Sequence, residues 1–317
     1  MNNSMILGVE IGGTKLQLAI GTPQGVIVAR VQGRVNVAAG GKGIRHWLQK
    51  KIPEFISTVS SRTIGIGVGF GGPMDTKAGR VLQSIQIKGW ENFPIREWFQ
   101  EQFNLPVIVI NDSNAATWGE YQKGYGRGCQ HFFYTNLGSG VGGGFVINGQ
   151  LFDGQGFGAG EFGHTYVPDW SSRYPGGAKK IEELCSGWAI EARLHRPGYI
   201  PETSSLYDKF SDKLAVVTAK DLGDAAQTRD DFALAEIDRI ASSMGLGLAN
   251  VLSLTGVEKI AIGGGVSNMG ELLIEPIRRY TQKYEFINST GRYSISHCQL
   301  GDEIVLVGAI LLAGESL

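Results

Sequence analysis

The sequence predicts an α/β protein built from two similar halves. Along its 317 residues, runs typical of strands alternate with amphipathic runs typical of helices, which is the pattern of α/β folds. Two segments, 9–25 and 135–150, also share one layout: a strand, a glycine-rich bend, a second strand and a turn that contains glycine. We interpret this as an internal duplication in which each half presents one glycine bend.

Apolar periodicity predicts the elements of the first half in order. Strands are expected at 5–9, 16–20, 25–31 and 63–70, and a helix is expected over 43–58. The continuous apolar run 105–111 predicts a strand buried on both faces, and a helix over 112–124 follows it directly.

The second half contains a longer helix and a third glycine cluster. Apolar residues at spacings of three and four predict an amphipathic helix over 233–254, which Thr255 and Gly256 end. A strand at 259–262 then meets the glycine cluster 263–265, and a helix follows at 270–280. The segment 181–194 is predicted to be helical, and 195–231 to be an irregular connection with one short helix.

Charge and cysteine content exclude several classes of protein. The 29 basic and 30 acidic residues nearly cancel, which argues against a nucleic-acid or membrane-surface partner and favours a small or neutral ligand. The three cysteines, Cys129, Cys185 and Cys298, lack paired spacing, so we expect reduced thiols that fill core space. Without a signal peptide or an apolar run of roughly 20 residues, the chain is expected in the cytoplasm.

Glycine is in excess and is clustered. The chain has 47 glycines, about twice the usual share of roughly 7%. At Gly12, Gly13 and Thr14 the bend can turn backbone N–H groups toward an anion, with Lys15 nearby. Gly138, Ser139 and Gly140 can do the same in the second half. The alternative for one bend is an ordinary tight β-turn beside a solvated lysine, but two similar bends favour phosphate.

Asp112 follows the buried strand at the end where open α/β sheets place their ligands. A carboxylate there can accept the proton of a substrate hydroxyl that attacks a phosphoryl group. The alternative is that Asp112 or Ser113 caps the helix that follows.

Two further carboxylate sites have a ligand-binding and a structural interpretation. Glu161 and His164 lie three residues apart in a glycine-rich segment, where they either hydrogen-bond sugar hydroxyls or are ordinary polar turn residues. Glu182 and Glu183 begin the helical segment 181–194, where their simplest role is to complement the helix dipole.

Taken together, these segments resemble the ROK family of repressors, open reading frames and sugar kinases. The motifs that carry the resemblance span nearly the whole chain: "GVEIGGTK", "GIGVGFGGPMD", "VINDSNAATWGE", "NLGSGVGGG", "GAGEFGH", "IAIGGGVSNMGELLIEPIRR" and "LVGAILLA". The resemblance implies a duplicated actin-like ATPase fold with a cleft between two domains. We expect an N-terminal domain at 1–115, with 304–317 packing back on it, and a larger domain at 116–303.

The resemblance also implies a set of site residues. Two hairpins would hold the phosphates of ATP with Mg²⁺: Gly12, Gly13, Thr14 and Lys15 form the first, and Gly138, Ser139 and Gly140 form the second. The loop Gly263, Gly264 and Gly265 would lie beneath adenosine. The residues expected to contact a hexose are Gly72, Asn111, Asp112, Glu161, His164 and Glu182, with Asp112 as the general base. Alignment on "CSG" makes Glu182, rather than Glu183, the sugar-binding glutamate.

The chain departs from the family pattern at several positions. Family kinases usually carry a zinc motif C-x-C-G-x-x-G-C-x-E, but Arg173, Pro175 and Lys180 occupy its cysteine positions here. These side chains cannot supply thiolates, so we predict no zinc and expect other hydrogen bonds to orient His164. Glu10 replaces a common Asp, which bears on how Mg²⁺ is held, and Gln86 replaces a common sugar-contacting Asn.

The sequence therefore predicts an ATP-dependent hexose kinase that phosphorylates the 6-OH group. Glucose is the default substrate, with N-acetylmannosamine, fructose and allose as alternatives, and the family favours a homodimer. A repressor of the same family is disfavoured because the first phosphate motif begins almost at Met5, which leaves no room for a DNA-binding module. A sugar sensor without kinase activity stays open because motif residues have changed.

Overall fold

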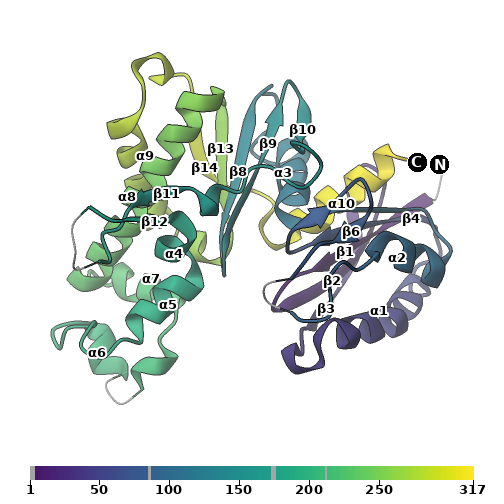
Figure 1. Ribbon diagram of the computed structural model, residues 1–317, viewed down its shortest axis with the longest axis horizontal. Coiled ribbons are helices and arrows are strands. Elements are labelled where there is room, and N and C mark those ends of the chain that lie inside the picture. The colour runs from purple at the N-terminus through teal and green to yellow at the C-terminus, as the bar shows by residue number, and fades with distance from the viewer. Residues whose placement is uncertain (1–3, 85–86, 173–175, 211–212) are drawn as a thin grey trace. The chain divides into compact units, whose positions relative to one another are not determined.

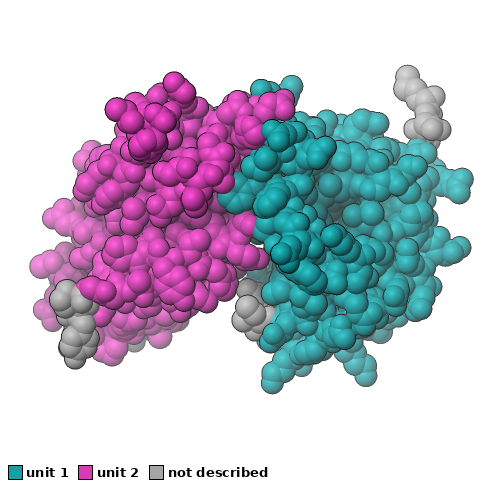
Figure 2. All heavy atoms as spheres, turned by 45° about the horizontal axis from the view of Figure 1, so that its top comes forward, with its two compact units in different colours: residues 1–128, 144–159, 299–317 teal, residues 129–143, 160–298 magenta. Residues whose placement is uncertain are grey.

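The computed structural model describes residues 4–84, 87–172, 176–210 and 213–317. Contacts divide the chain into two compact units, coloured separately in Figure 2. Unit 1 comprises residues 1–128, 144–159 and 299–317, and unit 2 comprises residues 129–143 and 160–298. The domain boundary expected after residue 115 falls inside helix α3 (Asp112–Lys123), and it stays a prediction.

Unit 1 is organised around a five-stranded sheet of order β3-β2-β1-β4-β7. Its antiparallel part consists of β1 (Ser4–Ile11), β2 (Lys15–Gly21) and β3 (Ile27–Arg34). On the other side of β1, strands β4 (Arg62–Phe70) and β7 (Val107–Asn111) add in parallel. The sequence predicts all five strands.

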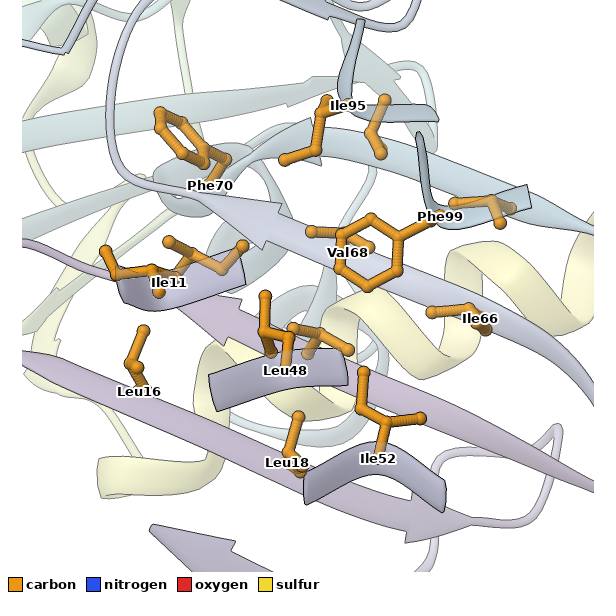
Figure 3. Packing of buried hydrophobic residues seen from close by; sticks show 14 of the residues in the cluster. Ile11, Leu16, Leu18, Leu48, Ile52, Ile66, Val68, Phe70, Ile95 and Phe99 are labelled. Carbon is orange, nitrogen blue, oxygen red and sulfur yellow. The ribbon is translucent and has the colours of Figure 1, made fainter. Parts of the chain in front are cut away.

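Helices cover both faces of this sheet (Figure 1) because side chains alternate along each strand. One face packs against α1 (Gly40–Ile56) and α2 (Ile95–Phe103), and Figure 3 shows Leu48 and Ile52 of α1 beside Leu16 and Leu18 of β2. The other face buries Ile6 and Ala19 against α10 (Ile304–Glu315), which packs with α3. Helix α2 was not predicted.

Helix α10 lies unusually close to its neighbours because glycines remove the intervening side chains. A methyl group at Gly308 would lie 1.7 Å from the carbonyl oxygen of Ala115 in α3, and one at Gly67 in β4 would lie 2.0 Å from that of Ala309. Part of the glycine excess therefore serves packing rather than loops. The helix is buried along most of its length, and no described helix is both long and apolar enough to cross a membrane.

The second five-stranded sheet has the order β10-β9-β8-β13-β14. Its strands are β8 (Phe132–Leu137), β9 (Val141–Ile147), β10 (Gln150–Phe152), β13 (Lys259–Gly263) and β14 (Ser294–His297). The boundary between the units falls inside β9, so β10 is counted with unit 1. Numbered in chain order, the strands of both sheets follow the order 3-2-1-4-5. This shared order confirms the duplication.

The helices of unit 2 differ from prediction in two places. Helices α8 (Asp231–Thr255) and α9 (Glu271–Tyr284) agree with it and pack together. The segment 181–194 is instead two helices, α4 (Ile181–Cys185) and α5 (Gly187–Leu194), because Ser186 caps α5 by accepting a hydrogen bond from the Ala189 N–H. The region 195–231 contains two helices rather than one, α6 (Ser205–Phe210) and α7 (Ala219–Gln227).

The remaining elements are short. Two hairpins were not predicted, β5 (Met74–Asp75) with β6 (Arg80–Val81), and β11 (Tyr166–Pro168) with β12 (Ala178–Lys180). Single 3₁₀ turns occur at Val37–Ala39, Phe162–His164, Leu214–Val216, Gly265–Met269, Ile287–Ser289 and Gly301–Glu303.

The close approach of α10 leads to a stability prediction. Gly308→Ala should lower the free energy of unfolding by about 1–3 kcal/mol, because the added methyl group overlaps the Ala115 carbonyl and forces α10 away from α3. Urea unfolding followed by circular dichroism measures the change. Gly177→Ala is the matched control, since its methyl group would meet only the Asp169 side chain at 3.7 Å. Equal stability of the two variants would contradict this packing.

Candidate active site

Each unit presents a glycine hairpin between its first two sheet strands. In unit 1 the Gly12 N–H donates to the Lys15 carbonyl at 3.1 Å, and in unit 2 the Gly138 N–H donates to the Gly140 carbonyl at 3.0 Å. These two amides close the turns. The exposed tips are Thr14 and Ser139, so both hairpins present a hydroxyl group and glycine backbone to solvent.

Lys15 is not simply solvated. Its ammonium lies 3.7 Å from the Asp302 carboxylate and is about one third exposed. An exposed ion pair of this kind is worth little, so the lysine can exchange this partner for another anion.

Asp112 is the first residue of α3, directly after strand β7. The helix is capped by Asn111, whose side-chain oxygen accepts hydrogen bonds from the N–H groups of Ser113 at 2.9 Å and Asn114 at 3.2 Å. The proposed cap at Asp112 or Ser113 is therefore wrong. One Asp112 oxygen, Oδ1, also accepts from the Ser113 N–H at 2.8 Å. The carboxylate lies at the N-terminus of α3, where the helix dipole favours negative charge.

Gly71 brings Asp112 and the first hairpin together within unit 1. A methyl group at Gly71 would lie 3.1 Å from Asp112 Oδ2, 3.5 Å from the Ile11 carbonyl oxygen and 3.6 Å from the Gly12 Cα. The Gly71 N–H also donates to the Ile11 carbonyl at 2.9 Å. The missing side chain at position 71 leaves space between the acid and the hairpin.

Asn111 and Gly72, both expected to contact a hexose, are joined to each other. The Asn111 side-chain amide donates to the Gly72 carbonyl at 3.2 Å. Together with its capping bonds, this contact gives Asn111 a structural role in fixing the start of α3. A role in sugar binding stays a prediction.

In unit 2 the second hairpin lies against Glu182 and the third glycine cluster. Glu182 Oε2 accepts from the Val141 N–H at 2.9 Å, and a methyl group at Gly140 would lie 2.8 Å from the same oxygen. At the base of the hairpin, a methyl group at Gly264 would lie 2.8 Å from the Gly138 nitrogen. The structure therefore brings together the predicted phosphate hairpin, the predicted adenosine loop and Glu182.

Glu161 precedes the 3₁₀ turn Phe162–His164 and His164 is its last residue, and both side chains are exposed. Buried Phe162 anchors the turn by an edge contact with Phe133. The His164 ring nitrogen Nδ1 lies 3.1 Å from Lys180 Nζ. Glu183 has a different role from Glu182, because its side chain accepts from the Lys180 N–H at the start of α4.

Glu10 lies on β1, two residues before the first hairpin. Its carboxylate accepts a hydrogen bond from the Gln17 side chain at 2.7 Å, and that amide also donates to the Asp302 carbonyl. Burial raises the pKa of Glu10, although Lys15 and the Gln17 hydrogen bond act in the opposite direction. This partly buried carboxylate beside the first hairpin is a candidate ligand for a cation.

The residues present do not fit a zinc ion. Arg173, Pro175 and Lys180 stand at the cysteine positions of the motif, and the first two, like Gln86, lie outside the described residues. The three cysteines are buried thiols rather than disulfides, and burial raises the pKa of the Cys185 thiol to about 12. Within the part of the chain that the structure describes, no group of His, Cys, Asp or Glu side chains is arranged to hold a metal.

Comparison with known families identifies the chain. The model of the ROK family matches residues 6–316. The chain belongs to the ROK family.

Among its ROK relatives is a glucokinase of Halalkalibacterium halodurans, 34% identical over 97% of this chain and 94% of the relative. A crystal structure of a ROK family glucokinase from Streptomyces griseus, in complex with glucose and AMPPNP, matches with a TM-score of 0.83 and 29% identity over 98% of this chain and 99% of that one. A xylose repressor of Caldicellulosiruptor bescii is 25% identical over 97% of this chain and 77% of its own length.

Three residues of the candidate site are not among those that the sequence predicts. Gly71 stands beside the expected Gly72, and Lys180 stands at a cysteine position of the zinc motif. Gly187, whose N–H donates to the Gly138 carbonyl at 2.7 Å, was placed inside a continuous helix. The Ser-Gly pair at 186–187 is a recognisable helix-start signal, whereas nothing local marks the other two.

The raised pKa of Glu10 gives a pH-dependent prediction. The pKa of Glu10 is raised in the folded protein above its value in the unfolded chain. The stability that such an acid contributes is fully present at a pH below its pKa in the unfolded chain. This stability is lost as the pH rises through its pKa in the folded protein. Glu10→Gln should therefore be more stable than wild type at pH 8, with the difference shrinking as pH falls toward 5. Urea unfolding midpoints across this range measure it, with exposed Glu202→Gln as control. Parallel curves for wild type and Glu10→Gln would contradict the assignment.

Proposed function

We propose that this ROK-family protein transfers the γ-phosphoryl group of ATP to a hexose, with glucose as the first substrate to test. The glucokinase of H. halodurans and the S. griseus glucokinase structure with glucose and AMPPNP support this reaction. The observation that carries the proposal is the Asp112 carboxylate at the end of β7, beside Gly71 and the first glycine hairpin.

Asp112 acts as the general base. In phosphoryl transfer, a positioned carboxylate accepts the hydroxyl proton as the oxygen attacks phosphorus. The bond from Asp112 Oδ1 to the Ser113 N–H orients the group, and the side-chain-free space at Gly71 receives the sugar hydroxyl. The acceptor is the 6-OH group, the primary and least hindered hydroxyl of a hexose.

The two hairpins hold the phosphates of ATP. Backbone N–H groups and the hydroxyls of Thr14 and Ser139 donate to phosphate oxygens, and Lys15 turns from Asp302 toward the added negative charge. The Gly263–Gly265 loop, which lies against the base of the second hairpin, supports the adenosine.

Mg²⁺ accompanies the nucleotide. Protein sites for Mg²⁺ commonly use one or two carboxylates together with the substrate phosphates, and Glu10, on β1 beside the first hairpin, is the carboxylate we propose for this role. When bound, the ion neutralises charge on the phosphate oxygens.

The hexose is recognised by side chains that accept hydrogen bonds and by side chains that donate them. Glu161 accepts hydrogen bonds from sugar hydroxyls, and His164 supplies a ring N–H, with Asn111, Gly72 and Glu182 completing the predicted set. A homodimer and a cytoplasmic location stay predictions. The alternative function is a sugar sensor without kinase activity, favoured by the altered zinc motif and by the changed motif residues Glu10 and Gln86.

Replacing the proposed base tests the mechanism. Asp112→Asn should lower kcat about 10²–10⁴-fold while hexose binding, measured by calorimetry, changes little, because the amide keeps the shape of the carboxylate but cannot take the proton. Asp231→Asn, at the first position of α8, is the matched control and should retain full activity. Wild-type turnover by Asp112→Asn would overturn the role of Asp112.

A hexose panel tests the reaction itself. With ATP and Mg²⁺, glucose should give the highest kcat/KM among glucose, N-acetylmannosamine, fructose and allose. The analogue 6-deoxyglucose should inhibit competitively without being phosphorylated, because it lacks the acceptor oxygen. Phosphorylation of 6-deoxyglucose would place the transfer elsewhere on the sugar. Binding of a hexose without any turnover would favour the sensor.

A further inference from the structure

We propose that Lys180 is the positioning residue of His164, and that its ammonium orients the imidazole where family kinases usually carry a zinc-ligating cysteine. The inference rests on the proposed function, because it concerns how His164 meets the hexose. It deepens that function by assigning one hydrogen bond, from His164 Nε2–H to a hexose oxygen.

The contact determines the donor and acceptor roles of the ring. A lysine ammonium has three donors and no acceptor. With Lys180 Nζ at 3.1 Å from His164 Nδ1, Nδ1 accepts and the ring proton of the neutral imidazole is on Nε2. A cation bound at one ring nitrogen thus leaves the other nitrogen as a donor, and this is the orienting effect that a metal on a histidine also has.

Backbone hydrogen bonds fix both ends of this contact. Strands β11 and β12 pair so that Lys180 lies opposite Tyr166, two residues after His164. The Ile181 N–H donates to the Thr165 carbonyl at 3.0 Å, and the His164 N–H donates to the Glu161 carbonyl at 3.0 Å. The lysine therefore needs only its side chain to reach the ring, and no metal is required to bring the two segments together.

Packing also holds the segment after β11 without a metal. Trp170 donates from its indole N–H to Ser243 Oγ at 2.8 Å, and the buried Arg193 guanidinium lies 4.8 Å from the centre of a Trp170 ring. Arg193 in turn pairs with buried Glu236 at 2.7 Å. These contacts attach the segment to α8 and α5, so the hairpin that carries Lys180 is anchored by side chains.

The same helix start also serves the second hairpin. Lys180 precedes α4, and Glu182 in its first turn accepts from the Val141 N–H. One backbone segment therefore places the cation that orients His164 and the carboxylate that holds the glycine hairpin.

Nitrogen NMR of the imidazole tests the positioning directly. At about pH 8.5, where ordinary histidines are neutral and lysines charged, the wild-type His164 spectrum should show protonated Nε2 and a hydrogen-bonded, unprotonated Nδ1. His164→Asn assigns its signals among the five histidines. Lys180→Met should move the Nδ1 signal, Lys180→Arg should largely restore it, and Lys179→Met should leave it unchanged. A protonated wild-type Nδ1, or an unmoved signal in Lys180→Met, overturns the proposal.

A double-mutant cycle on hexose affinity tests the consequence. Lys180→Met should raise the hexose KM about 3- to 10-fold, the worth of one hydrogen bond, with little change in kcat. Lys179→Met is the matched control, because Lys179 is the adjacent strand residue and donates instead to Ser171. In a His164→Asn background, Lys180→Met should add no further increase. Additive effects would show that Lys180 acts independently of His164 and would overturn the proposal.

Two outcomes separate the inference from the proposed function. If the NMR signals behave as expected but His164→Asn binds hexose normally, the positioning stands and the assigned sugar contact fails.

Metal analysis adds an independent readout: the purified protein should contain no stoichiometric zinc, and chelator treatment followed by return of Mg²⁺ should leave its activity unchanged. One zinc bound per chain would overturn the replacement of the metal by Lys180.

Discussion

The Asn111 cap at the end of β7 is the constraint on which the proposed chemistry depends. Asn111 accepts hydrogen bonds from the Ser113 and Asn114 N–H groups and donates to the Gly72 carbonyl, so strand β7, helix α3 and the loop after β4 meet at this residue. Asp112 then has little freedom, and it lies beside Gly71 and the first hairpin. The close, glycine-mediated contact of α3 with α10 keeps the helix itself in place. A general base needs this fixed geometry more than it needs an unusual pKa.

The duplicated sheets show how one topology serves two tasks. Both have the strand order 3-2-1-4-5 and a glycine hairpin between their first two strands. In unit 1 the fifth strand, β7, leads to the acid. In unit 2 the fifth strand, β14, ends at His297, whose Nε2 lies 3.0 Å from Ser267 Oγ, and Ser267 donates to the Gly264 carbonyl at 2.6 Å. The fifth strand thus leads to the proposed base in one half and supports a glycine loop in the other.

Local pattern was sufficient to predict most of the frame and part of the site. The strands of both hairpins, the buried strand β7 and the amphipathic helix α8 follow from apolar periodicity. The predictions that failed concern features set by competition between neighbouring side chains or by contacts between residues far apart in the sequence. Asn111, Asp112 and Ser113 are all acceptable helix caps, and only the geometry of β7 selects Asn111. The contact between Lys180 and His164 depends on the register of a short hairpin, which no periodicity in the sequence marks. The tight packing at Gly308 likewise involves residues far apart in the chain.

The central claim is that Asp112 receives a proton from the hexose. A crystal structure with glucose and a non-hydrolysable ATP analogue tests it most directly, through the distance between the Asp112 carboxylate and the sugar hydroxyl nearest the γ-phosphate. The account predicts a hydrogen bond of about 2.6–3.2 Å to the 6-OH group. A bound glucose whose acceptor hydroxyl faces another group, with Asp112 turned away from the sugar, would contradict it.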